Sequence, residues 1–158
     1  MSIELTAAAR TLLNDPETAK VLATVDSDGV PHVVTKQSIH AGKDGNVHLL
    51  QILEFSATNR NLVRSIWFDR KVAIGLRGKD GQSIQIKGRP IQNHITGPLY
   101  EEHYVKLRQR RGDVDLAGVW VISPEEIIDE SSAARRTDEE RKRPNINHLD
   151  RLIKKPTT

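Results

Sequence analysis

Short hydrophobic runs, separated by turn-forming residues, occupy most of the chain. The runs at 21–25 and 30–39 flank Asp28-Gly29, and two such runs joined through an Asp-Gly turn predict a β-hairpin. Four further runs are bounded by turn-forming residues and predict strands at 47–53, 72–76, 83–88 and 117–122. Ser123 and Pro124 are expected to end the last of these strands.

Three segments show helical periodicity, with apolar residues recurring at the 3.6-residue spacing of one helix face. The predicted helices cover residues 5–13, 59–68 and 99–110. In the second of them, Leu62, Ile66 and Trp67 are expected to face inward. Because several strands follow one another through tight turns, they must be antiparallel neighbours. The pattern therefore predicts an α+β fold, mostly β, in which a small antiparallel barrel carries helices on its outside.

The charge of the chain divides it into a body, residues 1–130, and a C-terminal extension, residues 131–158. The extension carries eight Lys or Arg and four Asp or Glu, whereas the body carries 16 basic and 17 acidic residues. The overall charge of +3 therefore comes from the extension, and binding of nucleic acid by the body is not expected. Residues 131–143 are predicted to form a solvated helix or linker, and a short amphipathic helix is predicted after Pro144.

Composition excludes several classes of chemistry. The sequence has no Cys, so disulfides, thiolate nucleophiles and Cys-ligated metals are excluded. It has no apolar run of the roughly 20 residues that cross a membrane, and its first residues lack the pattern of a signal peptide. We therefore expect a soluble cytoplasmic protein with no membrane partner.

No dinucleotide-binding, P-loop or nucleophile-elbow motif is present, and no catalytic residue can be named from the sequence. The six histidines include no His-x-x-x-His pair, so no metal site is predicted. His32, His40 and His48 lie in or beside neighbouring predicted strands. They either cluster or lie on the solvent side, and the second interpretation is favoured.

The segment where the third predicted strand gives way to a helix is richer in polar groups. The hydroxyl and N–H groups of Ser56, Thr58 and Asn59 converge at the positive end of the helix dipole, which suits an anion. Arg60 and Arg64 follow and can add charge-assisted hydrogen bonds. Ordinary capping of the helix by Thr58 explains the same pattern without a ligand, and both interpretations remain open.

Three segments in order along the chain carry a resemblance to a known family. They are Val21–Val34 with its Asp-Gly turn and Pro31-His32, the Thr58–Ala73 segment with Asn61-Leu62 and Asp69, and the alternating strand Ile84–Arg89. Together they resemble the FMN-binding split-barrel superfamily, which contains the pyridoxamine 5'-phosphate oxidase-like and small FMN-binding proteins. The resemblance covers residues 20 to about 123. It implies a six-stranded antiparallel split barrel with flanking helices, and a homodimer with FMN bound at the subunit interface.

The resemblance also implies a set of cofactor-binding residues. The edge of the isoalloxazine would lie along Thr35, Lys36, Gln37 and Ser38, with Gln51 and Ile52 covering the dimethylbenzene and ribityl parts. The phosphate would lie at Ser56, Thr58 and Asn59, with Asn61 holding the turn and Arg60 nearby, while Gln85 and Trp120 would reach the flavin from the partner subunit.

Two of these positions determine which positive charges lie near the flavin and its phosphate. Lys36 would stabilise the anionic reduced flavin from beside N1 and C2=O, or would point to solvent. Related proteins often carry a basic residue at or before the position of Thr58, but here Ala57 and Thr58 stand there. The phosphate carries about −1.5 to −2 charge, so Arg60, Arg64 or a residue of the partner subunit is expected to supply the cation.

The function implied is that of a flavoprotein, with oxidoreductase activity as the leading hypothesis. Electrons would pass from a reduced nicotinamide or similar donor through FMN to a small-molecule substrate. A flavin carrier or sensor without enzymatic activity is one alternative. A split barrel that binds haem or a deazaflavin, or binds no cofactor, is another.

Overall fold

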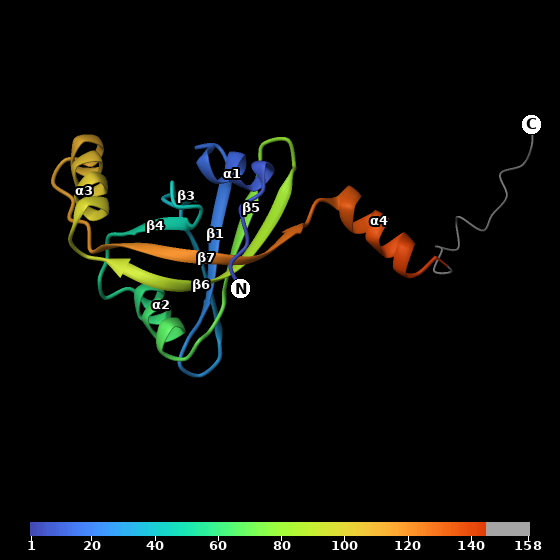
Figure 1. Cartoon of the computed structure of the whole chain (residues 1–158), viewed down its shortest axis with the longest axis horizontal. Coiled ribbons are helices and arrows are strands. Elements are labelled where there is room, and N and C mark those ends of the chain that lie inside the picture. The colour runs from blue at the N-terminus through green and yellow to red at the C-terminus, as the bar shows by residue number, and fades with distance from the viewer. Residues whose placement is uncertain (145–158) are drawn as a thin grey trace, which may run out of the picture.

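The computed structural model describes residues 1–144, which form seven strands and four helices (Figure 1). The strands are β1 (Ala19–Val25), β2 (Pro31–Thr35), β3 (His40–Ala41), β4 (Val47–Gln51), β5 (Val72–Arg77), β6 (Ser83–His94) and β7 (Gly118–Asp129). The helices are α1 (Ala7–Asn14), α2 (Ala57–Trp67), α3 (Pro98–Arg111) and α4 (Ser132–Lys142).

One antiparallel sheet contains all seven strands, in the order β2-β1-β5-β6-β7-β4-β3. The two edge strands, β2 and β3, are consecutive in the chain and are joined only by residues 36–39. In a flat sheet these edges would lie about 29 Å apart, whereas a link from Thr35 to His40 spans about 18 Å at most. The sheet must therefore curl until its edges approach, which produces the half-barrel that Figure 1 shows.

A buried lysine fastens this link to the rest of the barrel. The ammonium of Lys20, on β1, donates hydrogen bonds to the carbonyl of Leu13 at 2.6 Å and to that of Ile39 at 2.9 Å. Its side chain is almost fully buried, and burial lowers the pKa of Lys20. The backbone N–H of Lys36 also donates to the carbonyl of Lys20 at 2.9 Å. One residue thus joins β1, the end of α1 and the link between the two sheet edges.

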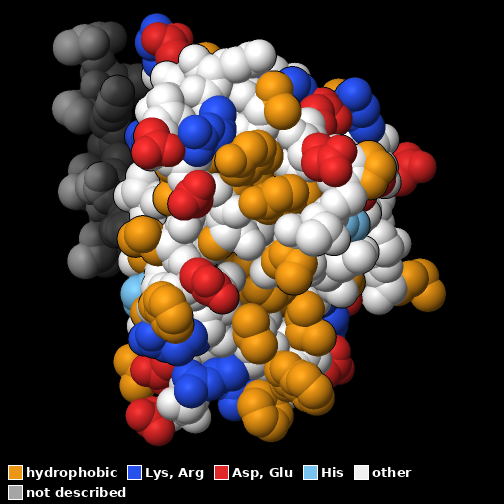
Figure 2. Space-filling model, turned by 90° about the vertical axis from the view of Figure 1, so that its left-hand side faces the viewer, with side chains coloured by type: hydrophobic (Ala, Val, Ile, Leu, Met, Phe, Trp, Pro, Cys, Tyr) orange, Lys and Arg blue, Asp and Glu red, His pale blue; other side chains and the backbone are white. Residues whose placement is uncertain are grey.

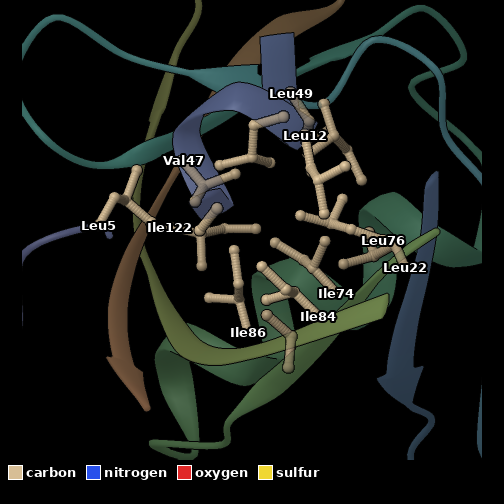
Figure 3. Close-up of a cluster of buried hydrophobic side chains, with 14 of the residues drawn as sticks. Leu5, Leu12, Leu22, Val47, Leu49, Ile74, Leu76, Ile84, Ile86 and Ile122 are labelled. Carbon is tan, nitrogen blue, oxygen red and sulfur yellow. The ribbon is translucent and has the colours of Figure 1, made fainter. Parts of the chain in front are cut away.

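The main hydrophobic core fills the inside of the curled sheet (Figure 3). Leu5 and the α1 residues Ala9, Leu12 and Leu13 cover it, and strand residues such as Ile74 and Ile86 complete it. A second, smaller cluster lies under α3 and consists of Leu50, Leu107, Leu116 and Val119, with Tyr100 and Tyr104 packed against it. The predicted α+β class and antiparallel topology are confirmed by this arrangement.

The strand count differs from the predicted six. The run at 30–39 is interrupted after Thr35 by a turn, in which the N–H of Ile39 donates to the carbonyl of Lys36, and pairing resumes as β3. Residues 36–39 therefore cross between sheet edges instead of continuing a strand. The prediction of a single strand over 30–39 was wrong for this reason.

The last two strands are longer than predicted. β7 passes through Pro124 and continues to Asp129, so the prediction that Ser123 and Pro124 end it was wrong. The pairing of β6 with β7 shifts register between Lys87 and Gly88, opposite Pro124, and a strand at such a bulge does not need the missing N–H of proline. At the same point Gly88 lies so close to the carbonyl of Ser123 that a Cβ atom would overlap it.

Helix α2 buries a different face from the one predicted. Leu62 is buried as expected, but Ile66 is 42% exposed and Trp67 is 79% exposed. The helix instead turns Thr58, Asn61 and Ser65 toward the sheet, where their polar atoms find hydrogen-bond partners. Apolar periodicity alone did not identify the buried face because that face is mainly polar.

The C-terminal extension begins as predicted with a polar helix, α4, which lies beyond the end of β7 (Figure 1). The amphipathic helix expected after Pro144 lies outside the described residues. Within residues 1–144, none of the helices combines the length and apolar character needed to traverse a lipid bilayer.

The close approach at Gly88 generates a test of the β6–β7 pairing. Gly88→Ala places a methyl group against the backbone oxygen of Ser123, which cannot move without opening the pair, so we expect a loss of about 3 kcal/mol of unfolding free energy. Gly75→Ala is the matched control, since its Cβ would meet only the Val21 side chain, at 2.9 Å, and should cost about 1 kcal/mol. Urea unfolding measures both, and equal losses would contradict this account.

Candidate functional site

The corner between β4 and α2 holds a connected set of polar side chains. Gln51, the last residue of β4, is fully buried, and its amide N–H group donates to the Ser56 hydroxyl at 2.9 Å and to the Leu53 carbonyl at 2.7 Å. Ser56 is the N-cap of α2 and accepts a hydrogen bond from the N–H of Asn59 at 3.1 Å. The cap is therefore Ser56, two residues before Thr58, which was considered for this role. Gln51 couples that cap to the strand.

Lys36 brings a positive charge to this corner. Its ammonium donates to the Gln51 side-chain oxygen at 3.0 Å, so one amide group separates it from the Ser56 hydroxyl. Burial lowers the pKa of the Lys36 ammonium below its ordinary value. Of the two orientations considered from the sequence, the side chain takes the inward one.

The N-terminus of α2 keeps two free donors. The backbone N–H groups of Ala57 and Thr58 have no acceptor within the described residues, and the first turn contains no acidic residue. The third donor, on Asn59, is used by the Ser56 cap. The Asn59 side chain is fixed from β7, since the indole N–H of Trp120 donates to its carbonyl oxygen at 2.8 Å. Trp120 is fully buried, and its indole nitrogen is hydrogen-bonded to Asn59 of the same chain.

The remaining predicted residues of α2 have structural partners. Arg60 extends back over the preceding loop and donates to the Phe55 carbonyl at 2.8 Å. The amide of Asn61 donates to the Thr24 hydroxyl at 3.0 Å, both groups being buried, so Asn61 anchors the helix on β1. The Thr58 hydroxyl lies on the same side of the helix as Asn61, 3.4 Å from Nε2 of His32.

A groove beside the corner gathers three more of the predicted residues. Gln37, Ser38 and Ile52 line a pocket of about 430 Å³, to which α3 contributes Arg110 and Arg111. This volume falls within the range of small-molecule sites. The Ser38 hydroxyl bonds both backbone groups of Leu50, and Gln37 bonds the backbone of β1, so both side chains are held in place.

Two predicted residues lie away from these features within the chain. Thr35 is exposed at the end of β2, opposite Val21. Gln85 lies on β6, eight residues before Asn93, the partner of Trp120, which is about 26 Å along the strand. A contact from Gln85 to a flavin therefore stays a prediction for a second subunit.

The donor set of the corner fits a phosphate monoester. It offers a hydroxyl, two free backbone N–H groups at the positive end of a helix and one ammonium, with no carboxylate in the first turn of α2. The sequence alone indicated Arg60, Arg64 or a residue of the partner subunit as the source of the cation, and not Lys36. The signal that identifies Lys36 is tertiary, because it depends on the crossing of residues 36–39 beside β4.

A second polar cluster, formed by three histidines, lies on the other side of the groove. The sequence pattern did not predict this set of three. His40 on β3, His48 on β4 and His103 on α3 place ring nitrogens within 4.8 Å of one another. His40 and His48 are paired across the β3–β4 hairpin, whereas His32 lies at the opposite sheet edge, near Thr58. The favoured interpretation, that these histidines lie on the solvent side, was wrong for His48, which is buried against His40. His40 and His48 cluster as in the alternative interpretation, but the third member is His103 of α3 and not His32.

Two of the three rings are held by polar partners. Nδ1 of His40 donates to the Ser38 carbonyl at 2.8 Å, and Nε2 of His48 lies 3.0 Å from the Asp44 carboxylate. Burial, reinforced by the neighbouring His40, lowers the pKa of His103 to about 4. Burial also lowers the pKa of His40. Both of these imidazoles are therefore neutral at physiological pH.

The sequence matches no family model and no curated protein, and the likeness to known proteins lies in the structure. HupZ of Group A Streptococcus is 22% identical, with a TM-score of 0.66 over 81% of this chain and 95% of HupZ. An FMN-binding protein of Syntrophomonas wolfei is 16% identical, with a TM-score of 0.65 over 78% of this chain and 84% of that protein. HutZ, the haem storage protein of Vibrio cholerae, is 15% identical, with a TM-score of 0.57 over 80% of this chain and 95% of HutZ.

These likenesses extend over nearly the whole length of each relative and over the body of this chain. At such identities they establish the fold and leave the ligand open, since the names of the relatives include both FMN and haem. The chain therefore has the split-barrel fold of these proteins.

Proposed function

We propose that the protein is an FMN-binding flavoprotein whose cofactor phosphate is held at the corner between β4 and α2. The observation that carries the proposal is the chain of hydrogen bonds from Lys36 through Gln51 to Ser56, which sets an ammonium beside a helix N-terminus with free N–H groups. A phosphate needs both kinds of partner, because it carries about −1.5 to −2 charge and accepts several hydrogen bonds. In this site Lys36 takes the place of the basic residue that Ala57 and Thr58 do not supply.

The ring system of the flavin would occupy the adjoining groove. Gln37, Ser38 and Ile52 form its wall, and Ile52 packs against the apolar cluster under α3. This assignment keeps Gln37 and Ser38 along the ring, as the resemblance implies, but moves Lys36 from the ring to the phosphate. Arg110 and Arg111 give the open side of the groove a positive potential that attracts anionic ligands.

We further propose an oxidoreductase function, in which bound FMN supplies the electron transfer between a reduced nicotinamide or similar donor and a small-molecule acceptor. The protein residues would position the flavin and exclude water, since no catalytic acid or base is assigned. A yellow protein that reduced nicotinamide does not bleach would instead be a flavin carrier or sensor. A colourless protein that takes up haem or a deazaflavin would favour the other alternative, for which the likeness to HutZ gives one reason.

A homodimer would complete the site, and the apolar outer face of α2 suits this role. Trp67, Phe68 and Phe55 are all more than half exposed, and Ile91 and Ile95 are exposed near the end of β6. Figure 2 shows orange side chains gathered over the middle and lower part of one face of the molecule. Exposed apolar area of this kind marks an interaction surface in a soluble protein. The partner subunit would then bring its own residues, Gln85 among them, to the flavin.

FMN titration tests the phosphate site. Lys36→Met should weaken FMN binding by at least about tenfold, because a hydrogen bond to a charged group contributes about 1.5–3 kcal/mol. Lys79→Met removes an exposed lysine of the β5–β6 turn and should leave the affinity unchanged. Flavin fluorescence quenching measures both.

Riboflavin, which lacks the phosphate, separates two roles of Lys36. If Lys36 serves the phosphate, Lys36→Met should change riboflavin affinity by less than about twofold. An equal loss for riboflavin and FMN would assign Lys36 to the ring, and unchanged FMN binding would remove it from the site. Thr58→Ala and Arg60→Ala should each weaken FMN binding less than Lys36→Met, because Thr58 carries no charge and the Arg60 guanidinium extends back to the Phe55 carbonyl.

The dimer is tested on its proposed apolar face. Trp67→Glu places a charge on that face, so we expect a dimer-to-monomer shift in sedimentation velocity together with reduced FMN affinity. Ile3→Glu, at another partly exposed apolar position, is the control and should leave both unchanged. A wild-type protein that sediments as a monomer and still binds FMN tightly would overturn the shared site.

A further inference from the structure

The histidine cluster carries an inference that is independent of the flavin. It lies on the wall of a pocket of about 290 Å³ whose other lining residues come from the β3–β4 turn and α3. His40, His48 and His103 belong to three different elements, so only the folded chain brings them together. Their ring planes are tilted, by 78° between His40 and His48 and by 57° between His40 and His103.

We propose that His40, His48 and His103 bind one divalent transition-metal ion of the zinc class through three imidazole nitrogens, with a fourth position open to the pocket. Three imidazole nitrogen donors suit Zn²⁺, Co²⁺, Ni²⁺ or Cu²⁺ and do not suit Mg²⁺ or Ca²⁺. Three protein ligands with a fourth position left for water or another small ligand is the arrangement of an open zinc site.

The hydrogen bonds around the rings favour metal binding. A backbone carbonyl can only accept, so Nδ1 of His40 carries the proton and its Nε2 keeps a free lone pair. The Asp44 carboxylate beside His48 is the kind of outer partner that orients metal-bound imidazoles. Both contacts fix a ring through one nitrogen and leave the other available.

The backbone makes room for this arrangement at Gly42. A Cβ atom at that position would overlap Nε2 of His48, so the absence of a side chain lets the His48 ring pack there. The ring is 4% exposed and held from two sides, by Gly42 and by Asp44. The fold therefore fixes the orientation of the His48 ring, which cannot rotate as the ring of a surface histidine does.

Distance and charge are compatible with an ion. Metal–nitrogen bonds of 2.0–2.1 Å put ligand nitrogens about 3.3 Å apart, so the observed limit of 4.8 Å requires only small side-chain adjustments. The pocket lining carries Lys43, Asp44, Glu102 and Lys106, whose formal charges cancel. Lys106 is also neutralised locally, because its ammonium lies 2.6 Å from the Glu102 carboxylate.

The test is a Co²⁺ titration of the full-length, tag-free protein after treatment with a chelator, followed through the visible bands of four-coordinate cobalt. We expect one Co²⁺ per chain. His103→Ala and His40→Ala should each weaken binding by at least about tenfold and should abolish these bands. His94→Ala removes a histidine at the end of β6, outside the cluster, and should titrate like the wild type.

Thermal unfolding distinguishes loss of the metal site from loss of the folded structure. Added Zn²⁺ should raise the Tm of the wild type and of His94→Ala but not that of His103→Ala, whose own cooperative transition shows that it is folded. A wild type that binds no cobalt, or His40→Ala and His103→Ala variants that bind it as well as the wild type, would overturn the inference. FMN titration is a separate measurement, so failure of the metal site and failure of the flavin site are distinguished.

Discussion

The short link between β2 and β3 constrains the whole molecule. Four residues join the two edges of a seven-stranded sheet, and this is possible only if the sheet curls into a barrel. The same link carries Lys36 to the β4–α2 corner and leads directly to His40 in the histidine cluster. Lys20 holds it from inside the barrel. The proposed phosphate site and the proposed metal site are thus placed by the one segment that closes the fold.

Helix α2 shows how a buried polar face can serve a binding site. Asn61 bonds Thr24 on β1, and Asn59 is fixed by Trp120 on β7, so the helix is oriented by directional bonds at its N-terminal end. Apolar packing alone would allow the helix to rotate or slide by fractions of a turn. An anion site made of helix N–H groups requires that these groups keep their direction, which the hydrogen bonds provide.

The sequence was sufficient for features set by local pattern, and insufficient for those set by distant contacts. Hairpins, helices and the resemblance that names the fold all come from short-range signals. Pro124 was misjudged because the cost of a proline depends on whether its N–H is needed, which the bulge at Gly88 decides. Trp67 was misplaced because periodicity does not say which face is buried. The role of Lys36 and the meeting of His103 with His40 depend on tertiary structure alone.

The sheet order also has a consequence for how the chain acquires its structure during synthesis. β4 finds its long partner only in β7, through pairs such as Leu49 with Trp120, and the intervening chain contributes α2, β5, β6 and α3 first. Until then the apolar β4 is bordered only by the two-residue β3. Closure of that seam is a non-local event and is therefore slow. The nascent chain must protect an unpaired hydrophobic strand until β7 has been translated.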